Sequence, residues 1–116
     1  MREAVSPQSS TVVLDRPRHL FVDLNALEKA EELTGKNMLD IRSWPNLTAK
    51  DWKALIWACL LRQDDEVTLE LVGACVHPGN LKYVQDKVYE AVKNSMPEQE
   101  EKEDGEEEDP PKPPAL

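Results

Sequence analysis

The sequence predicts a mainly α-helical domain with a small N-terminal β-hairpin, an α+β fold in which about four helices pack round a central apolar helix. Two short segments rich in β-branched residues open the folded part, and apolar residues then recur at helical spacing. A final acidic stretch, rich in proline, is expected to form a disordered tail. The 116 residues suit one domain.

The acidic residues are concentrated at the C-terminal end. Between Pro97 and Leu116 there are nine acids and two lysines, so this segment carries −7 of the total charge of −9. Its few apolar side chains cannot offset the entropy lost on ordering, and we expect disorder over 97–116. Residues 1–10 are expected to be flexible, which leaves 11–96 as the helical domain. The tail either keeps the chain soluble or docks on a basic partner.

The hairpin is expected to pair residues 11–15 with residues 18–23. Both stretches are rich in β-branched and apolar residues, and Arg16 and Pro17 separate them. Proline is tolerated in the turn because its missing N–H is not needed there.

The first helix is expected to run from about Asp23 to Thr34, with Gly35 as its left-handed end. Two caps compete for its start: Asp23 alone, or Asn25 in a capping box with Glu28. Its apolar side is expected to comprise Leu24, Leu27, Ala30 and either Glu31 or Leu33.

The segment that follows, residues 36–46, has no regular period, and Pro45 blocks a helix at Trp44. A loop with several large apolar groups does not stay in water, so we expect these to be held in the core. They are Met38, Leu39, Ile41 and Trp44.

Residues 48–62 predict the central helix, which Thr48 begins with Asp51 at the third position. Its main apolar face comprises Trp52, Leu55, Ile56, Cys59 and Leu60. A second side is apolar too, which is unusual for a helix of a small domain. Either the hairpin or the last helix covers this side, or it is an exposed patch that binds a partner. The candidate partner-binding residues are Ala54, Trp57, Ala58 and Leu61.

Two further helices are expected after a polar break at 63–67. Thr68 caps a short one, whose apolar face comprises Leu69, Val72, Gly73 and Val76. The turn at 77–80 stops it, and Asn80 caps the last helix, which Pro97 closes. The apolar repeat of the last helix comprises Leu81, Val84, Val88 and Ala91 or Val92.

Groups that could carry chemistry are scarce, and we expect neither an enzyme nor a bound cofactor. Cys75 and His77 could supply half of a zinc site, but Cys59 and His19 would complete it at no recognised spacing. The acidic residues at 64–66 lack the alternating ligands and the glycine of a calcium loop. No serine, histidine and acid are grouped as a triad, and no glycine-rich phosphate loop is present.

Two classes of binding partner are also not expected. Lysine and arginine are scattered among acids, which argues against nucleic acid. The longest apolar run, Ala54–Leu61, is too short to span a membrane. Without an export signal, Cys59 and Cys75 are expected to be reduced, buried thiols.

Two stretches of the sequence resemble the tail assembly chaperones of long-tailed, siphovirus-type phages and prophages. The first is FVDLNALEKAEELTG, from Phe21 to Gly35. The second combines the run 55–58 (LIWA) with Asp65 and with the run 68–72 (TLELV). With the hairpin, the resemblance covers residues 11–95.

The resemblance implies a non-enzymatic protein of the host bacterial cytoplasm that binds the tape measure protein, a long apolar helical chain that sets tail length. It implies that the client stays soluble until the tail tube forms round it, and it allows contact with the tail tube protein and self-association. Such a chaperone needs an apolar groove or patch, for which the side of Trp57 and Leu61 is our candidate. The alternative is a small acidic regulatory adaptor, or a nucleic-acid mimic that inhibits a host enzyme.

Overall fold

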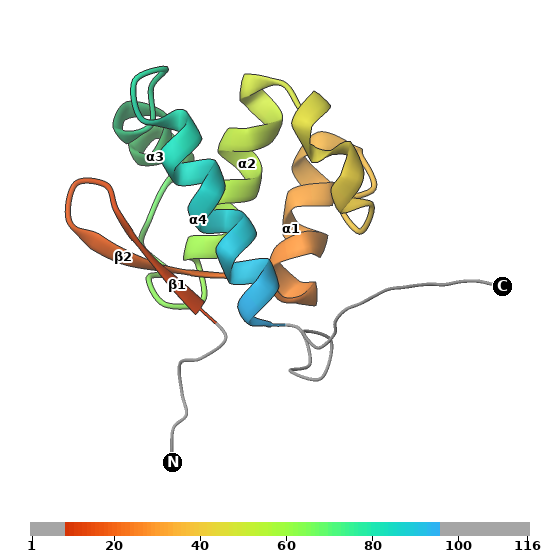
Figure 1. Ribbon diagram of the computed structural model, residues 1–116, viewed down its shortest axis with the longest axis horizontal. Helices are drawn as coiled ribbons and strands as arrows, with labels where there is room; N and C mark the ends of the chain where they lie inside the picture. Colours follow the sequence, from red (N-terminus) through yellow and green to blue (C-terminus); the bar gives the residue numbers. More distant parts are fainter. Residues whose placement is uncertain (1–8, 96–116) are drawn as a thin grey trace, which may run out of the picture.

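The computed structural model describes residues 9–95 and confirms the predicted fold class, a mainly helical domain with a two-stranded antiparallel hairpin (Figure 1). The elements follow in the order β1 (Ser9–Val13), β2 (Pro17–Phe21), α1 (Leu24–Thr34), the 3-10 helix η2 (Ile41–Asn46), α2 (Ala49–Leu60), α3 (Leu69–Cys75) and α4 (Leu81–Asn94). The tail predicted at 97–116, Pro97 included, and most of the N-terminus predicted as flexible lie outside the described residues.

The hairpin starts earlier in the chain than predicted. β1 begins at Ser9, inside the segment expected to be flexible, and Pro17 pairs with Val13 as the first residue of β2 rather than forming the turn. The first position of a strand tolerates proline, because the missing N–H need not join the ladder.

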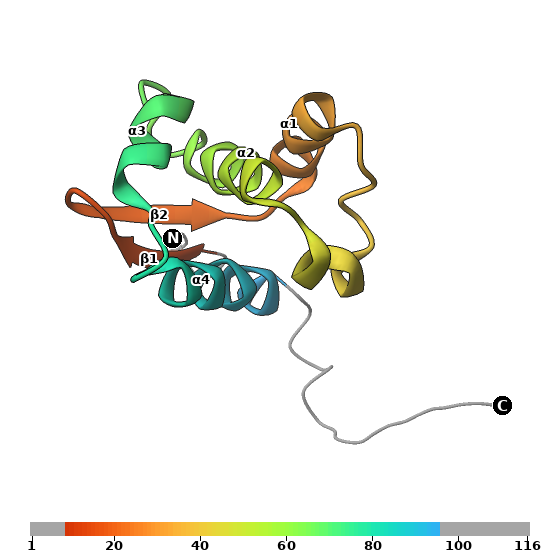
Figure 2. The ribbon, with the colours of Figure 1, turned by 90° about the horizontal axis from the view of Figure 1, so that it is seen from above.

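Helix α4 explains the early start of β1. The Ser10 hydroxyl donates a hydrogen bond of 2.6 Å to the Lys87 carbonyl, and the Asn94 side-chain amide donates one of 2.9 Å to the Ser9 carbonyl. Both strands contact α4, while β2 also contacts α2. The hairpin therefore lies between these two helices (Figure 2).

Of the two caps considered for α1, Asp23 is the one used. Its carboxylate accepts a hydrogen bond of 2.9 Å from the Ala26 backbone N–H, and Gly35 ends the helix in the left-handed conformation with φ 72°. The cap makes Leu24 the first helical residue, where its side chain is 69% exposed, so its predicted place in the core is wrong. The buried residues of α1 are Ala26, Leu27 and Ala30.

The connection from α1 to α2 is anchored in the core at fewer points than predicted. Met38 and Trp44 are fully buried and Ile41 packs against the core, but Leu39 is 63% exposed. Pro45 does not exclude helical structure, because it lies within the 3-10 helix η2. The i→i−3 hydrogen bonds on either side of Pro45 are kept, since the Ser43 N–H donates to Asp40 and the Leu47 N–H to Trp44.

Trp44 belongs to an aromatic cluster that joins three elements. Its ring centroid lies 6.0 Å from that of Trp52 in α2 and 5.5 Å from that of Tyr89 in α4, and the latter two are 6.1 Å apart. The Trp44 indole N–H donates to the Met38 carbonyl at 3.3 Å. The cluster fixes the position of η2 against both helices.

Helix α2 is central, as predicted: it contacts α1, α3 and β2. Its capping box is complete, with the Asp51 N–H donating to the Thr48 hydroxyl at 3.2 Å and the Thr48 N–H donating to the Asp51 carboxylate at 3.1 Å. Each large apolar side chain that α2 buries stabilises the fold by roughly 1.5–3 kcal/mol. The whole predicted main face is buried: Trp52, Leu55, Ile56, Cys59 and Leu60.

The Asp51 carboxylate is itself buried and needs a counter-charge. The Lys36 ammonium, from the segment after α1, lies 2.5 Å from it. The hydrogen bond from Lys36 holds the pKa of Asp51 below its usual value, against the opposing effect of burial. This ion pair holds the segment between α1 and η2 against the N-terminal end of α2.

A second ion cluster fastens the hairpin turn to the loop between α2 and α3. The buried Arg18 guanidinium bonds Asp15 at 2.8 Å and also pairs with Asp64, to which Arg16 donates at 2.9 Å. Its hydrogen bonds hold the pKa of Asp15 at about 2. Asp64, considered above as a calcium ligand, is thus paired with two arginines.

Helix α3 begins as predicted and covers the core only in part. The Thr68 hydroxyl accepts a hydrogen bond of 3.0 Å from the Leu71 N–H. Of its predicted apolar face, Val72 is buried, Val76 is half-buried and Gly73 is exposed. Gly73 and Val76 lie at the outer edge of this face, where they border a surface groove.

Asn80 stands at the start of α4, but its side chain does not cap that helix. It accepts from the His77 N–H at 2.8 Å and donates to the Cys75 carbonyl at 2.9 Å, so it closes the end of α3 instead. Of the predicted repeat of α4, Leu81 is only half-buried, and the buried residues are Val84, Val88, Ala91 and Val92. Within residues 9–95, no helix is long and apolar enough to cross a membrane.

Candidate functional site

The four residues predicted to bind a partner do not form one exposed surface. Ala54 and Ala58 are each 3% exposed, while Trp57 and Leu61 are half-buried and pack against the core. The expectation of an exposed patch is therefore wrong for the two alanines. The other two side chains have different neighbours.

Helix α1 covers the side of α2 that carries Ala58 and Leu61, where we expected the hairpin or the last helix. These two residues share a shallow surface hollow with Asn25, Ala26 and Lys29. Because Ala26 and Ala58 are small, α1 and α2 can approach each other closely here. Trp57 lies elsewhere, next to the loop between α2 and α3, and its indole N–H donates to a backbone carbonyl of that loop.

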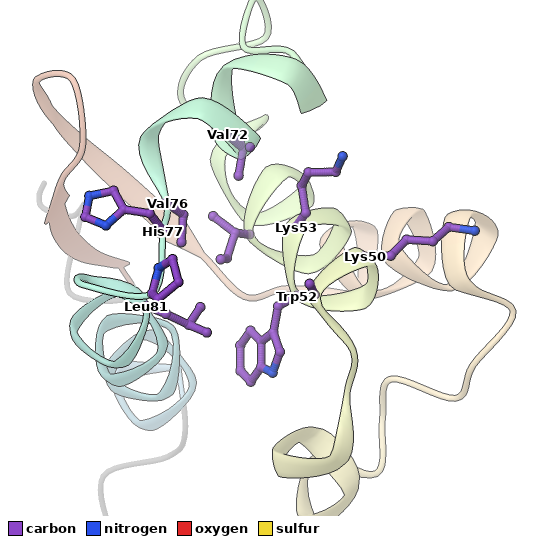
Figure 3. A pocket seen from close by; sticks show the side chains of 11 residues that line it. Lys50, Trp52, Lys53, Val72, Val76, His77 and Leu81 are labelled. Atoms are coloured by element: carbon purple, nitrogen blue, oxygen red, sulfur yellow. The ribbon is translucent and has the colours of Figure 1, made fainter.

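A more apolar hollow lies between α2, α3 and the turn into α4, and we call it the α2–α3 groove (Figure 3). Its volume is about 450 Å³. Binding pockets of about 300–1,000 Å³ are common, so the groove can admit a few side chains of a partner. Its floor comprises Trp52, Ile56 and Val72.

The wall of the groove is apolar and comes from the end of α3 and the start of α4. Val76 and Leu81 are half-buried, and Leu81 points toward the Trp52 ring (Figure 3). The turn between these helices keeps the wall in place. In that turn the Gly79 N–H donates to His77 Nδ1 at 3.1 Å, which leaves the proton of a neutral imidazole on Nε2.

The rim of the groove carries only positive charge. Lys50 and Lys53 stand on α2, one turn apart, and no acidic residue lines the groove. Within residues 9–95, neither ammonium has a carboxylate partner within 4 Å. By contrast, Lys36, Lys82 and Lys87 are all paired. The groove is thus a cationic site on a chain with a net charge of −9.

Gly73 leaves room for the aliphatic part of the Lys53 side chain at the edge of the groove. A Cβ atom at residue 73 would lie 3.2 Å from Lys53 Cδ. Glycine in a helix costs about 1 kcal/mol relative to alanine. Here its lack of a side chain keeps the groove mouth open beside α3.

The residues with reactive side chains are dispersed. Cys59 is buried, and burial raises the pKa of its thiol, whereas Cys75 is only half-buried, so the prediction of two buried thiols is wrong for the latter. His19 on β2 and His77 in the turn between α3 and α4 are both exposed. Within residues 9–95, no three histidine, cysteine or acidic side chains meet in a way that could hold a metal ion.

Sequence reasoning did not find the groove. Its floor was recognised as core, and Lys50 and Lys53 resemble ordinary surface residues of a helix. One signal was available, namely two lysines three residues apart in the first turns of α2 with no acid at positions three or four away along the helix. Asp51, although it lies between the two lysines in the sequence, is not their partner, because its side chain is buried.

Comparison with known proteins identifies no relative of this chain: no family model matches it, and neither a curated protein nor a solved structure matches it.

Proposed function

We propose that this protein is a tail assembly chaperone of a long-tailed phage or prophage, which binds the tape measure protein and keeps it soluble while the tail tube assembles. The observation that carries the proposal is the α2–α3 groove, with its apolar floor and wall. Amphipathic helices are commonly recognised by placing apolar side chains in such a groove. The resemblance of residues 11–95 to this chaperone family supplies the identity of the client.

The form of the groove suits a client with many equivalent sites. Its floor is closed by buried side chains, and its volume admits only a few side chains from outside. A small contact of this kind gives weak binding by one copy. Several copies along one long helical client would cover its apolar surface and release it readily as tube subunits arrive.

The test is co-expression of the full chain with the tape measure protein of the same phage or prophage, followed by measurement of the soluble fraction of the client. We expect the chain to raise that fraction. Gly73→Gln places a side chain at the groove mouth without removing any core contact, and it should abolish the effect. A chain that leaves the client insoluble would contradict the chaperone function.

The matched control is Ala74→Gln, one residue along on the same helix. Ala74 is exposed and does not line the groove. This variant should keep the client soluble as well as the unchanged chain does. If both glutamine variants fail equally while both remain folded, the groove is not the docking site.

A further inference from the structure

The lysine pair at the groove rim is placed where it destabilises the isolated chain. Lys50 lies in the first turn of α2 and Lys53 in the next, close to the positive end of the helix dipole. The two residues are also an i,i+3 pair of like charge, a spacing at which side chains on a helix are neighbours. Both effects are unfavourable, and the Asp51 carboxylate of the same helix end pairs with Lys36 rather than with either of these lysines.

Carboxylates from a partner would relieve both effects. Acids placed along the mouth of the groove would each meet one of the two ammonium groups, while an apolar side chain between them would enter between Val76 and Leu81. In Figure 3 the two lysine side chains diverge, Lys53 toward α3 and Lys50 away from the groove floor, so each would stand beside a different part of a bound helix.

We propose that the α2–α3 groove selects an amphipathic helix whose apolar stripe is flanked by acidic residues. Lys50 and Lys53 form ion pairs with these acids. This inference rests on the proposed function and narrows the client segment to one of stated chemistry. The groove and such a helix are complementary in charge, because two lysines and no acid line the groove. No other lysine, arginine or acid lines the groove, so selection depends on this pair.

The test uses two synthetic helical peptides with the same leucine stripe, one flanked by glutamates and the other by lysines. Each is added to the isotopically labelled full chain, and amide chemical shifts are recorded. The glutamate peptide should shift the signals of Lys50, Lys53, Gly73 and Val76, and added salt should weaken its binding. The lysine peptide should bind at least about tenfold more weakly.

A charge reversal separates recognition from loss of folding. The double variant Lys50→Glu/Lys53→Glu should prefer the lysine peptide, with the shifts still confined to the groove signals, whereas an unfolded chain would lose the dispersion of those signals. It is expected to fold, because an acid in the first turn of α2 suits the helix dipole. The control Arg42→Glu/Lys93→Glu changes the net charge equally at sites away from the groove and should keep the original preference.

Other outcomes would overturn the inference. Equal binding of both peptides, or shifts confined to another surface, would mean that the lysines select nothing. Groove signals that move with protein concentration alone would make a second copy the occupant. Signals that move when the acids between residues 98 and 109 are replaced by amides in the full chain would make the chain's own acidic segment the occupant.

The two proposals can fail separately. If the glutamate peptide binds the groove but the tape measure protein stays insoluble, the chaperone function fails and the selectivity stands. If the charge-reversed chain keeps the tape measure protein as soluble as the unchanged chain does, the chaperone function stands and the selectivity fails.

Discussion

The indole N–H of Trp57 donates a hydrogen bond of 3.0 Å to the carbonyl of Val67, and this bond joins the middle of α2 to the loop that leads into α3. Val67 is buried, so its carbonyl depends on this bond. A side chain that could have been the anchor of an interface is therefore a structural brace. The same loop carries Asp64, which the two arginines of the hairpin turn hold from the other side.

Replacing Trp57 should reveal this bracing role. Trp57→Phe keeps an aromatic ring but removes the N–H donor, which should lower the free energy of unfolding by about 1 kcal/mol. Trp57→Ala should cost about 2–3 kcal/mol, and Trp52→Ala, in the core, about 3–5 kcal/mol. Urea unfolding monitored by circular dichroism measures all three. A Trp57→Ala variant as stable as the unchanged chain would show that the side chain is free to serve a partner.

The ion pair between Lys36 and Asp51 should contribute to stability at neutral pH. Lys36→Met leaves a buried carboxylate supported only by Thr48, at a cost of about 1–3 kcal/mol. Loss of a fully buried pair costs more, but the Lys36 side chain is 47% exposed and water screens part of the effect. The control is Lys29→Met, because Lys29 is 3.8 Å from an exposed acid and should matter little.

The contribution of Asp51 should depend on pH in a defined direction. Its pKa in the folded state is lowered, so its stabilising effect is fully present above the ordinary aspartate pKa of about 3.9 and is lost as the pH falls through the lower, folded value. The stability difference between the unchanged chain and Lys36→Met should therefore shrink below about pH 4. Urea midpoints at pH 7 and at successively lower pH values measure it, and a difference that grows in acid would contradict this assignment.

The two cysteines should differ in their rates of thiol labelling. Cys59 is buried and its pKa is raised by burial, so it should react only when the domain opens. Cys75, half-buried at the end of α3, should react faster. Mass spectrometry after timed alkylation, with Cys75→Ser as the reference, separates the two sites. Rapid reaction of Cys59 without denaturant would show that α2 is not the closed centre of the fold.

Two glycine substitutions should have opposite effects on stability. Gly35 has φ 72° and ends α1, so Gly35→Ala should cost about 1 kcal/mol through backbone strain, although the space around it is open. Gly73→Ala lies within α3, and the flexible Lys53 stem can move aside, so this change should stabilise by up to about 1 kcal/mol. Thermal melts of the two variants measure both stability changes and test whether the backbone conformation at each glycine decides if alanine stabilises or destabilises.

The success of sequence reasoning depended on how local the deciding interactions were. The start of α2 was predicted because Thr48 and Asp51 are three residues apart and satisfy each other. The central position of α2 was predicted because apolar residues occupy more than one of its sides. Leu24 was assigned to the core on spacing alone, but the cap at Asp23 places it at the exposed edge of the first turn.

The groove could not be predicted because it depends on distant segments. Whether Lys53 borders a cavity is decided by where α3 and the turn at 77–80 pack, and the local pattern of two lysines without a nearby acid does not specify that packing. Asn80 illustrates the same limit. It had the usual residue type for a helix cap, yet its side chain bonds backward to Cys75 because the tight turn brings that carbonyl within reach.

The hydrogen bonds from Ser10 and Asn94 have a consequence for synthesis in the cell. Ser10 and Ser9 of β1 bond to residues of α4 that lie 77 and 85 residues further along the chain. A nascent polypeptide that has emerged only as far as α3 lacks the surface against which β1 is fixed, and long-range pairing of this kind slows folding. The domain should therefore remain open, with its Trp44 cluster incomplete, until the ribosome has released α4.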